Sequence, residues 1–200
     1  MRAAAIALIP TLLAVHLWAD ARGARALRAA GKLGASAAFI AVALARGVEG
    51  ALGRGILTGL ALSVVGDALL LSSRRAAFLA GLGAFLLAHV AYAVAFAGVA
   101  RPSAVVGLAV AAITGAALRW LWPHLDALRT PVVAYCVVIT AMLWLALGVD
   151  RPEIRAGATL FYASDLLVAR DRFVRPGFVN RVVGLPLYYA GQLLLALAVR

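Results

Sequence analysis

The chain has few charged residues: Asp, Glu, Lys and Arg together make up 14% of its 200 residues. A soluble globule of this size needs far more polar surface, so the composition excludes an ordinary water-soluble domain. The hydrophobic share of 65% indicates instead that lipid surrounds most of the chain. The apolar runs lack the alternation of barrel strands, which favours a bundle of membrane helices.

Cysteine, lysine and the common catalytic motifs are also scarce or missing. Cys136 is the single cysteine, which excludes an internal disulfide and a cysteine-rich metal site. Lys32 is the single lysine among 19 basic residues, and together with abundant alanine it favours a GC-rich bacterial genome. The sequence has no GxSxG elbow, Walker loop, dinucleotide fingerprint or closely spaced histidine pair. We therefore expect a multi-pass protein of the bacterial inner (plasma) membrane without a cofactor or a metal.

Charges and Pro/Gly punctuation divide the sequence into eight apolar runs, each long enough for a short membrane-spanning helix. The first run is interpreted as a retained helix and not as a signal peptide, because seven comparable runs follow it. We predict a single all-α transmembrane domain over residues 1–200, with helices at about 4–20, 31–46, 55–73, 77–98, 103–121, 131–149, 154–170 and 178–199.

The net charge of +11 comes from basic residues that lie between the apolar runs. This placement is typical of topology signals and of contacts with anionic headgroups, so we expect membrane lipids and no nucleic acid as partners. Twelve basic residues, Lys32 and Arg172 among them, fall in the connections after odd-numbered runs, and seven fall on the other side. The difference favours a cytoplasmic location for the arginine-rich side. No protein partner is inferred.

Of the eight acidic residues, only Asp67 and Asp165 lie well inside apolar runs. The others, including Asp20 and Asp171, fall at predicted helix ends or in loops, where we expect them to be solvated. A carboxylate in hydrocarbon costs at least a few kcal/mol, so such residues usually face a polar interior and serve a function. A structural hydrogen bond between helices is the alternative.

Each of these two aspartates lies about twelve residues into its run, and the two runs have the same direction. At ~1.5 Å per residue both carboxylates then lie roughly 18 Å from the same membrane face. We predict that they meet and that one retains its proton beside the ionised other, an arrangement suited to acid/base hydrolysis.

Other polar side chains on the neighbouring predicted helices reach a similar depth. His89 and Tyr92 lie one turn apart on one helix face, and so do Tyr188 and Gln192. We predict a polar cavity that opens toward the arginine-rich side and is formed by the two aspartates together with Ser63, His89, Tyr92, Tyr188, Tyr189 and Gln192. For His89 and Tyr189 ordinary core packing is the alternative.

The two halves of the chain also resemble each other. Residues 66–70 (GDALL) and 164–168 (SDLLV) each end an apolar run before arginines, and an aromatic hydroxyl follows in the next run of each half. This match favours a four-plus-four internal duplication.

The same segments resemble a known family. The first signature of the YhhN-like membrane proteins, the lysoplasmalogenase family, is similar to residues 63–70 (SVVGDALL) followed by residues 78–92 (FLAGLGAFLLAHVAY). The second is similar to residues 157–169 (GATLFYASDLLVA) followed by residues 188–192 (YYAGQ). Lys32-Leu33 stands where the family usually has Lys-Pro.

The resemblance implies a membrane-embedded lipid hydrolase. Such an enzyme cleaves the vinyl ether bond of lysoplasmalogen and releases a fatty aldehyde and glycerophosphoethanolamine or glycerophosphocholine. Asp67 and Asp165 would be the catalytic pair, and the substrate would be a lysophospholipid or another ether lipid.

Two other classes fit the residues. Paired intramembrane carboxylates with an internal repeat also occur in proton-coupled transporters and in lipid-binding membrane proteins. Matched proline or glycine breaks in equivalent helices would favour a transporter, and the apolar runs show no matched proline. The third class is a structural or regulatory bundle in which the aspartates only join helices.

Overall fold

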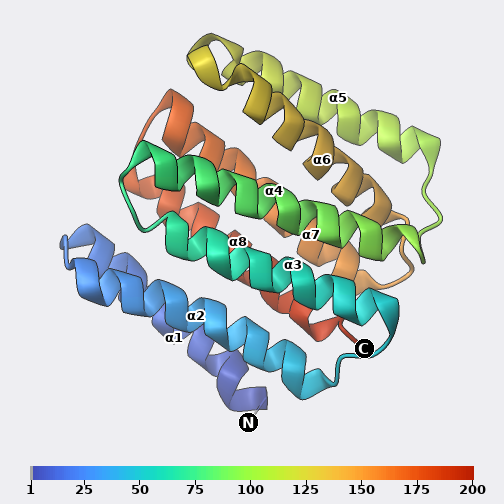
Figure 1. The fold of residues 1–200 in the computed structure, drawn as a ribbon, viewed down its shortest axis with the longest axis horizontal. Helices are drawn as coiled ribbons and strands as arrows, with labels where there is room; N and C mark the ends of the chain where they lie inside the picture. The colour runs from blue at the N-terminus through green and yellow to red at the C-terminus, as the bar shows by residue number, and fades with distance from the viewer. Residues whose placement is uncertain (1) are drawn as a thin grey trace.

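The computed structural model describes residues 2–200, so Met1 of the predicted domain lies outside the described residues. Within this range eight α-helices are joined by short connections (Figure 1). No strand occurs between residues 2 and 200, and the predicted all-α class is confirmed. The helices are α1 (Arg2–Ala21), α2 (Arg25–Arg46), α3 (Gly50–Leu69), α4 (Arg75–Ala97), α5 (Ala104–Leu121), α6 (Arg129–Leu147), α7 (Pro152–Ala169) and α8 (Phe178–Leu197). Two 3-10 turns, η1 (Trp122–His124) and η2 (Asp126–Leu128), link α5 to α6, and a π-helical turn, η3 (Arg170–Val174), extends α7.

The centre of the bundle consists of the two hairpins that carry Asp67 and Asp165. α3 pairs with α4 and α7 pairs with α8, and in the view of Figure 1 the second hairpin lies behind the first. α1 and α2 cover one side of this centre through contacts with α3 and α8. On the other side α6 contacts α4 and α7, and α5 packs against α6 at the edge of the bundle. Helices from both halves of the chain therefore surround one central region.

Six helical segments, from α1 to α6, are long and apolar enough to cross a membrane. The chain is accordingly an integral membrane protein. α7 and α8 are more polar, because α7 contains Glu153, Arg155 and Asp165, and α8 contains Asn180, Arg181 and Gln192. That these two helices also span the membrane stays a prediction, and so does the four-plus-four duplication.

Two helix bounds differ from the predicted ones and move key residues. α2 begins at Arg25, six residues before the predicted start, so Lys32, which was counted with the connecting residues, lies two turns inside a helix. α3 spans Gly50–Leu69, which puts Asp67 seventeen residues after the first residue (67 − 50) and two before the last. The predicted depth of twelve residues was wrong for Asp67, which lies nearer the arginine-rich end. The reason is that arginine is a good helix former whose long side chain reaches the membrane surface, so a charge does not end a helix.

Small residues bring α7 and α8 into backbone contact. A Cβ atom on Gly191 would lie 2.8 Å from the carbonyl oxygen of Gly157, which is closer than any side chain allows. Both positions therefore require glycine for this packing, as is common between membrane helices. The close approach packs α7, which carries Asp165, directly against α8, which carries Tyr188.

Candidate active site

A cavity of about 320 Å³ in the bundle is lined by residues from all eight helices. Asp67 and Asp165 both line it, as does Tyr188. The lining continues to Ser72 in the α3–α4 connection and to Asp171 in η3, so the cavity extends to the arginine-rich end of the bundle, as predicted. Across residues 2–200, no three His, Cys, Asp or Glu side chains gather closely enough to hold a metal ion.

Asp67 is buried and surrounded by donors. Its side chain is 1% exposed, and the ammonium of Lys32 lies 2.8 Å from its Oδ1 atom. The hydroxyls of Ser36 and Tyr188 both donate to its Oδ2 atom, each at 2.7 Å. The three donors come from α2 and α8, and together they stabilise the ionised carboxylate.

Asp165 has a different environment. The Tyr135 hydroxyl of α6 donates to its Oδ2 atom at 2.7 Å, and His89 Nε2 of α4 lies 3.5 Å from the same oxygen. His89 is fully buried, and its Nδ1 donates to the carbonyl oxygen of Phe85 at 2.6 Å. Since a carbonyl can only accept, Nδ1 carries a proton, and in a neutral ring Nε2 presents its lone pair to Asp165. No lysine or arginine pairs with Asp165 in the described part of the chain.

Aromatic rings lie between the two carboxylates. Tyr188 packs edge-on against Phe161 and Phe85, with ring centroids 5.3 Å and 5.9 Å apart, and Phe161 in turn packs against His89 at 4.5 Å. Among residues 2–200 no hydrogen bond joins the two aspartates. The structure thus brings both onto one cavity but gives each its own partners.

His89 and the remaining predicted residues do not line the cavity. Tyr92 donates to the Gln192 side-chain oxygen at 2.8 Å, which joins α4 to α8. Ser63 donates to the carbonyl oxygen of Gly59 one turn earlier. Tyr189 donates to the backbone oxygen of Lys32 at 3.0 Å and so supports the helix turn that carries the lysine.

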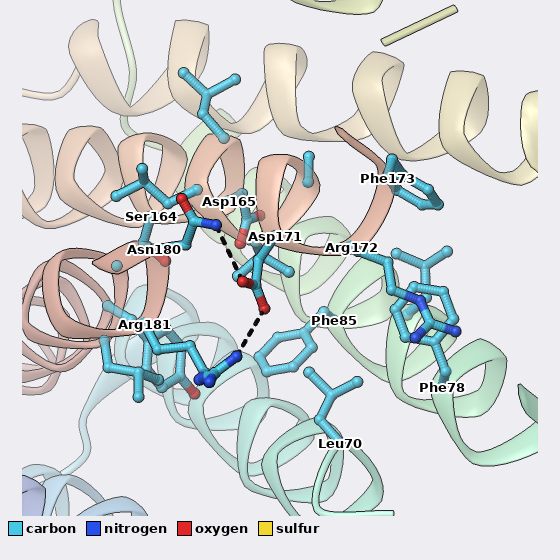
Figure 2. Close-up of a pocket in the computed structure, with 18 of the residues that line it drawn as sticks. Leu70, Phe78, Phe85, Ser164, Asp165, Asp171, Arg172, Phe173, Asn180 and Arg181 are labelled. Atoms are coloured by element: carbon cyan, nitrogen blue, oxygen red, sulfur yellow. Dashed lines mark hydrogen bonds and ion pairs between the residues drawn. The ribbon is translucent and has the colours of Figure 1, made fainter. Parts of the chain in front are cut away.

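Charged side chains form the mouth of the cavity. In Figure 2 Asp171 lies between Asn180 and Arg181, with an amide nitrogen at 3.0 Å and a guanidinium nitrogen at 3.4 Å. Arg181 also reaches Asp20 at 2.8 Å, and Arg28 reaches the same carboxylate at 3.3 Å. The expectation that Asp20 and Asp171 are simply solvated was wrong, because α1, α2, η3 and α8 bring them together with arginines.

Arg172 also lines the mouth, and its guanidinium lies 4.0 Å from the centre of the Phe78 ring (Figure 2). An arginine held on an aromatic face keeps its donors free for an anion.

Comparison with known proteins places the chain in a family. The sequence model of the YhhN family matches residues 27–199. The chain belongs to the YhhN family. The match confirms the resemblance seen in the aspartate motifs.

The YhhN chain has relatives named for an activity. It is 37% identical to the lysoplasmalogenase of Mycobacterium tuberculosis (strain CDC 1551 / Oshkosh) over 150 residues, which cover 68% of this chain and 56% of the relative. It is 35% identical to the human lysoplasmalogenase TMEM86A over 154 residues, which cover 72% of this chain and 64% of the relative. The matched segment thus spans less than two thirds of either relative. No solved structure matches the chain.

In this YhhN protein, sequence reasoning missed three residues at the aspartates: Lys32, Ser36 and Tyr135. A signal was available for Lys32, because it is the one lysine among 19 basic residues and it stands at the start of an apolar run. Ser36 and Tyr135 lie in apolar runs as isolated polar groups, and nothing in their spacing relates them to an aspartate on another helix.

Proposed function

We propose that the chain is a lysoplasmalogenase that hydrolyses the vinyl ether bond of a lysoplasmalogen in the bacterial inner membrane. The products are a fatty aldehyde and glycerophosphoethanolamine or glycerophosphocholine. The observation that carries the proposal is the difference between the two aspartates on one cavity: Asp67 is paired with a lysine and Asp165 is not. The relatives named lysoplasmalogenase support the choice of substrate.

Asp67 acts as the permanent carboxylate. Its contacts with Lys32, Ser36 and Tyr188 are all donor contacts to the ionised form. A preorganised negative charge of this kind stabilises a cation that develops in the cavity.

Asp165 acts as the general acid, with His89 as the group that shares its proton. An ionised Asp165 facing the lone pair of a neutral His89 ring across 3.5 Å would be repulsive, and one proton on either group removes the repulsion. Tyr135 holds the carboxyl group in place through Oδ2, while Oδ1 makes no hydrogen bond within residues 2–200. This second oxygen is therefore the one available to substrate.

The chemistry needs one proton and one water molecule. The acid protonates the vinyl ether carbon beta to oxygen, and the carbon next to oxygen becomes an oxocarbenium ion, which the Asp67 carboxylate stabilises. Water adds to that carbon and its proton returns to Asp165. The hemiacetal then collapses: its hydroxyl proton goes to the glycerol oxygen, the carbon–oxygen bond breaks, and aldehyde and glycerophospholipid alcohol separate.

The phosphate of the substrate has a matching site at the cavity mouth. Of four arginines at the ends of α3, α4 and α7 (Arg74, Arg75, Arg170 and Arg172), only Arg172 lines the cavity. Arg170 donates to Asn180 instead. We assign phosphate binding to Arg172, whose guanidinium is already oriented by Phe78.

The test is an assay of the purified protein with an alkenyl lysophosphatidylethanolamine, in which released aldehyde is measured by mass spectrometry. Wild-type protein is compared with Asp67→Asn and Asp165→Asn, and with Asp150→Asn as a matched control, because the Asp150 side chain is fully exposed. We expect aldehyde from the wild type and the control and almost none from the other two. A wild type without activity rejects the function, and bound lysolipid without aldehyde would favour the lipid-binding alternative. Undiminished activity in both aspartate variants rejects the mechanism.

A further inference from the structure

α5 and α6 form one edge of the bundle (Figure 1), and a second, apolar groove of about 650 Å³ lies between them. Its walls are formed mainly by small and aliphatic residues and one aromatic ring, among them Ala111, Gly115, Val137 and Trp144. None of the residues that line it is charged. Val137 is 63% exposed, as expected for a helix face that borders lipid.

This groove adjoins the catalytic cavity. Thr114 and Cys136 line both, so they stand at the boundary between them. The Thr114 hydroxyl also lies 2.9 Å from the Tyr162 hydroxyl of α7, which lines the catalytic cavity. Cys136 directly follows Tyr135, the donor to Asp165, and the groove therefore begins one residue from the tyrosine that contacts the acid.

We propose that the groove between α5 and α6 binds the hydrocarbon chain of the lysolipid substrate and gives the fatty aldehyde a lateral route into the bilayer. This inference rests on the proposed lysoplasmalogenase function. It adds to that function a binding site for a long alkenyl chain.

Size and polarity support this occupant. Pockets for drug-sized ligands measure roughly 300–1,000 Å³, and the groove, at about 650 Å³, falls within this range. The mouth is charged and unsuited to a hydrocarbon tail. A headgroup has no partner in the uncharged groove, whereas an alkyl chain matches its lining.

Gly115 allows the groove to be filled selectively. A Cβ atom at this position meets no other atom within 4 Å, so Gly115→Leu adds a side chain to the groove without a clash at Cβ. Gly83 of α4 is the matched control: its Cβ would also meet open space, and it lines neither cavity.

The first experiment compares kcat/KM for a hexadecenyl and a butenyl lysophosphatidylethanolamine. We expect Gly115→Leu to lower the long-chain to short-chain ratio by about tenfold, because an overfilled groove excludes only the long chain. Gly83→Leu should leave the ratio at the wild-type value. An unchanged ratio in Gly115→Leu, with an active enzyme, overturns the inference and leaves the proposed function intact.

The second experiment uses the unaltered protein. A saturated ether lysolipid, which cannot be hydrolysed, carries a diazirine at the end of its chain, and its isomer carries the diazirine on the headgroup. We expect the chain probe to label peptides of α5 and α6, the headgroup probe to label peptides at the mouth, and excess alkenyl lysolipid to suppress both.

Such labelling would support binding of the lysolipid chain in the groove even if the wild type released no aldehyde. The two proposals can therefore fail separately. Chain labelling confined to α1, α2 or η3 overturns the inference. Competition by diacyl phospholipid but not by lysolipid also overturns it, since the groove would then hold an ordinary membrane lipid.

Discussion

The ammonium nitrogen of Lys32 lies 2.8 Å from the Asp67 carboxylate, inside the bundle and almost completely shielded from solvent. Desolvation of two charges often costs as much as their attraction returns, so a buried ion pair is weak evidence for a role in stability. Its value here is that it gives a different environment to each of two aspartates that share one cavity.

Removal of the lysine should leave an unpaired buried carboxylate. We expect Lys32→Met to lower the free energy of unfolding by about 3–5 kcal/mol and to abolish activity. Thermal unfolding in detergent would measure the first effect. The double variant Lys32→Met/Asp67→Asn should recover much of the stability but not the activity. As a control, Asp150→Asn removes an exposed ion pair with Arg155 and should barely change the unfolding temperature. An equal loss of unfolding free energy in the single and the double variant would contradict this account.

The Tyr135 hydroxyl positions the carboxyl group of Asp165. We expect Tyr135→Phe to lower kcat by about ten- to a hundredfold, because a hydrogen bond to a group that becomes charged during the reaction is lost. Tyr162→Phe is the control, since that hydroxyl meets Thr114 and no carboxylate. Steady-state kinetics on both variants measure the difference. If Tyr162→Phe proved the more damaging, Tyr135 would have no special relation to the acid.

Arg172 should contribute to substrate binding and not to the chemical step. We expect Arg172→Gln to raise KM for the lysolipid by about tenfold with little change in kcat, as for a contact made equally in the ground and transition states. Arg74→Gln removes the same charge from the same end of the bundle without touching the cavity. A KM that rises equally in both variants would point to general attraction by the basic face.

The contact between Gly157 and Gly191 should tolerate no side chain. Gly191→Ala places a Cβ atom 2.8 Å from a backbone oxygen, which cannot move aside without shifting α7. We expect a loss of about 1–3 kcal/mol, visible as a lower unfolding temperature. At Gly83 of α4 an added Cβ atom meets no other atom within 4 Å. Gly83→Ala should therefore be neutral or slightly stabilising, because alanine favours the helix. Similar unfolding temperatures for the two variants would mean that α7 and α8 are not in backbone contact.

Much of this protein was predictable from sequence. The scarcity of charge determined the all-helical membrane class, and the two intramembrane carboxylates with their flanking motifs identified the family. These properties are local, since each depends on composition within one run or on the side chains of one helix. The counting of Lys32 with a connection arose from the same locality, because a charge at the start of an apolar run indicates a helix end unless its partner is known.

Only the tertiary structure decided how the two aspartates differ. Lys32, Ser36 and Tyr188 reach Asp67 from other helices, and Tyr135 and His89 reach Asp165 from two more. Sequence determines which residues each helix carries, but a pairing between helices depends on how their surfaces pack and on which rotations bring small residues into contact. The placement of the one buried lysine beside Asp67, which leaves Asp165 without a lysine or arginine partner in the described part of the chain, is a product of that packing.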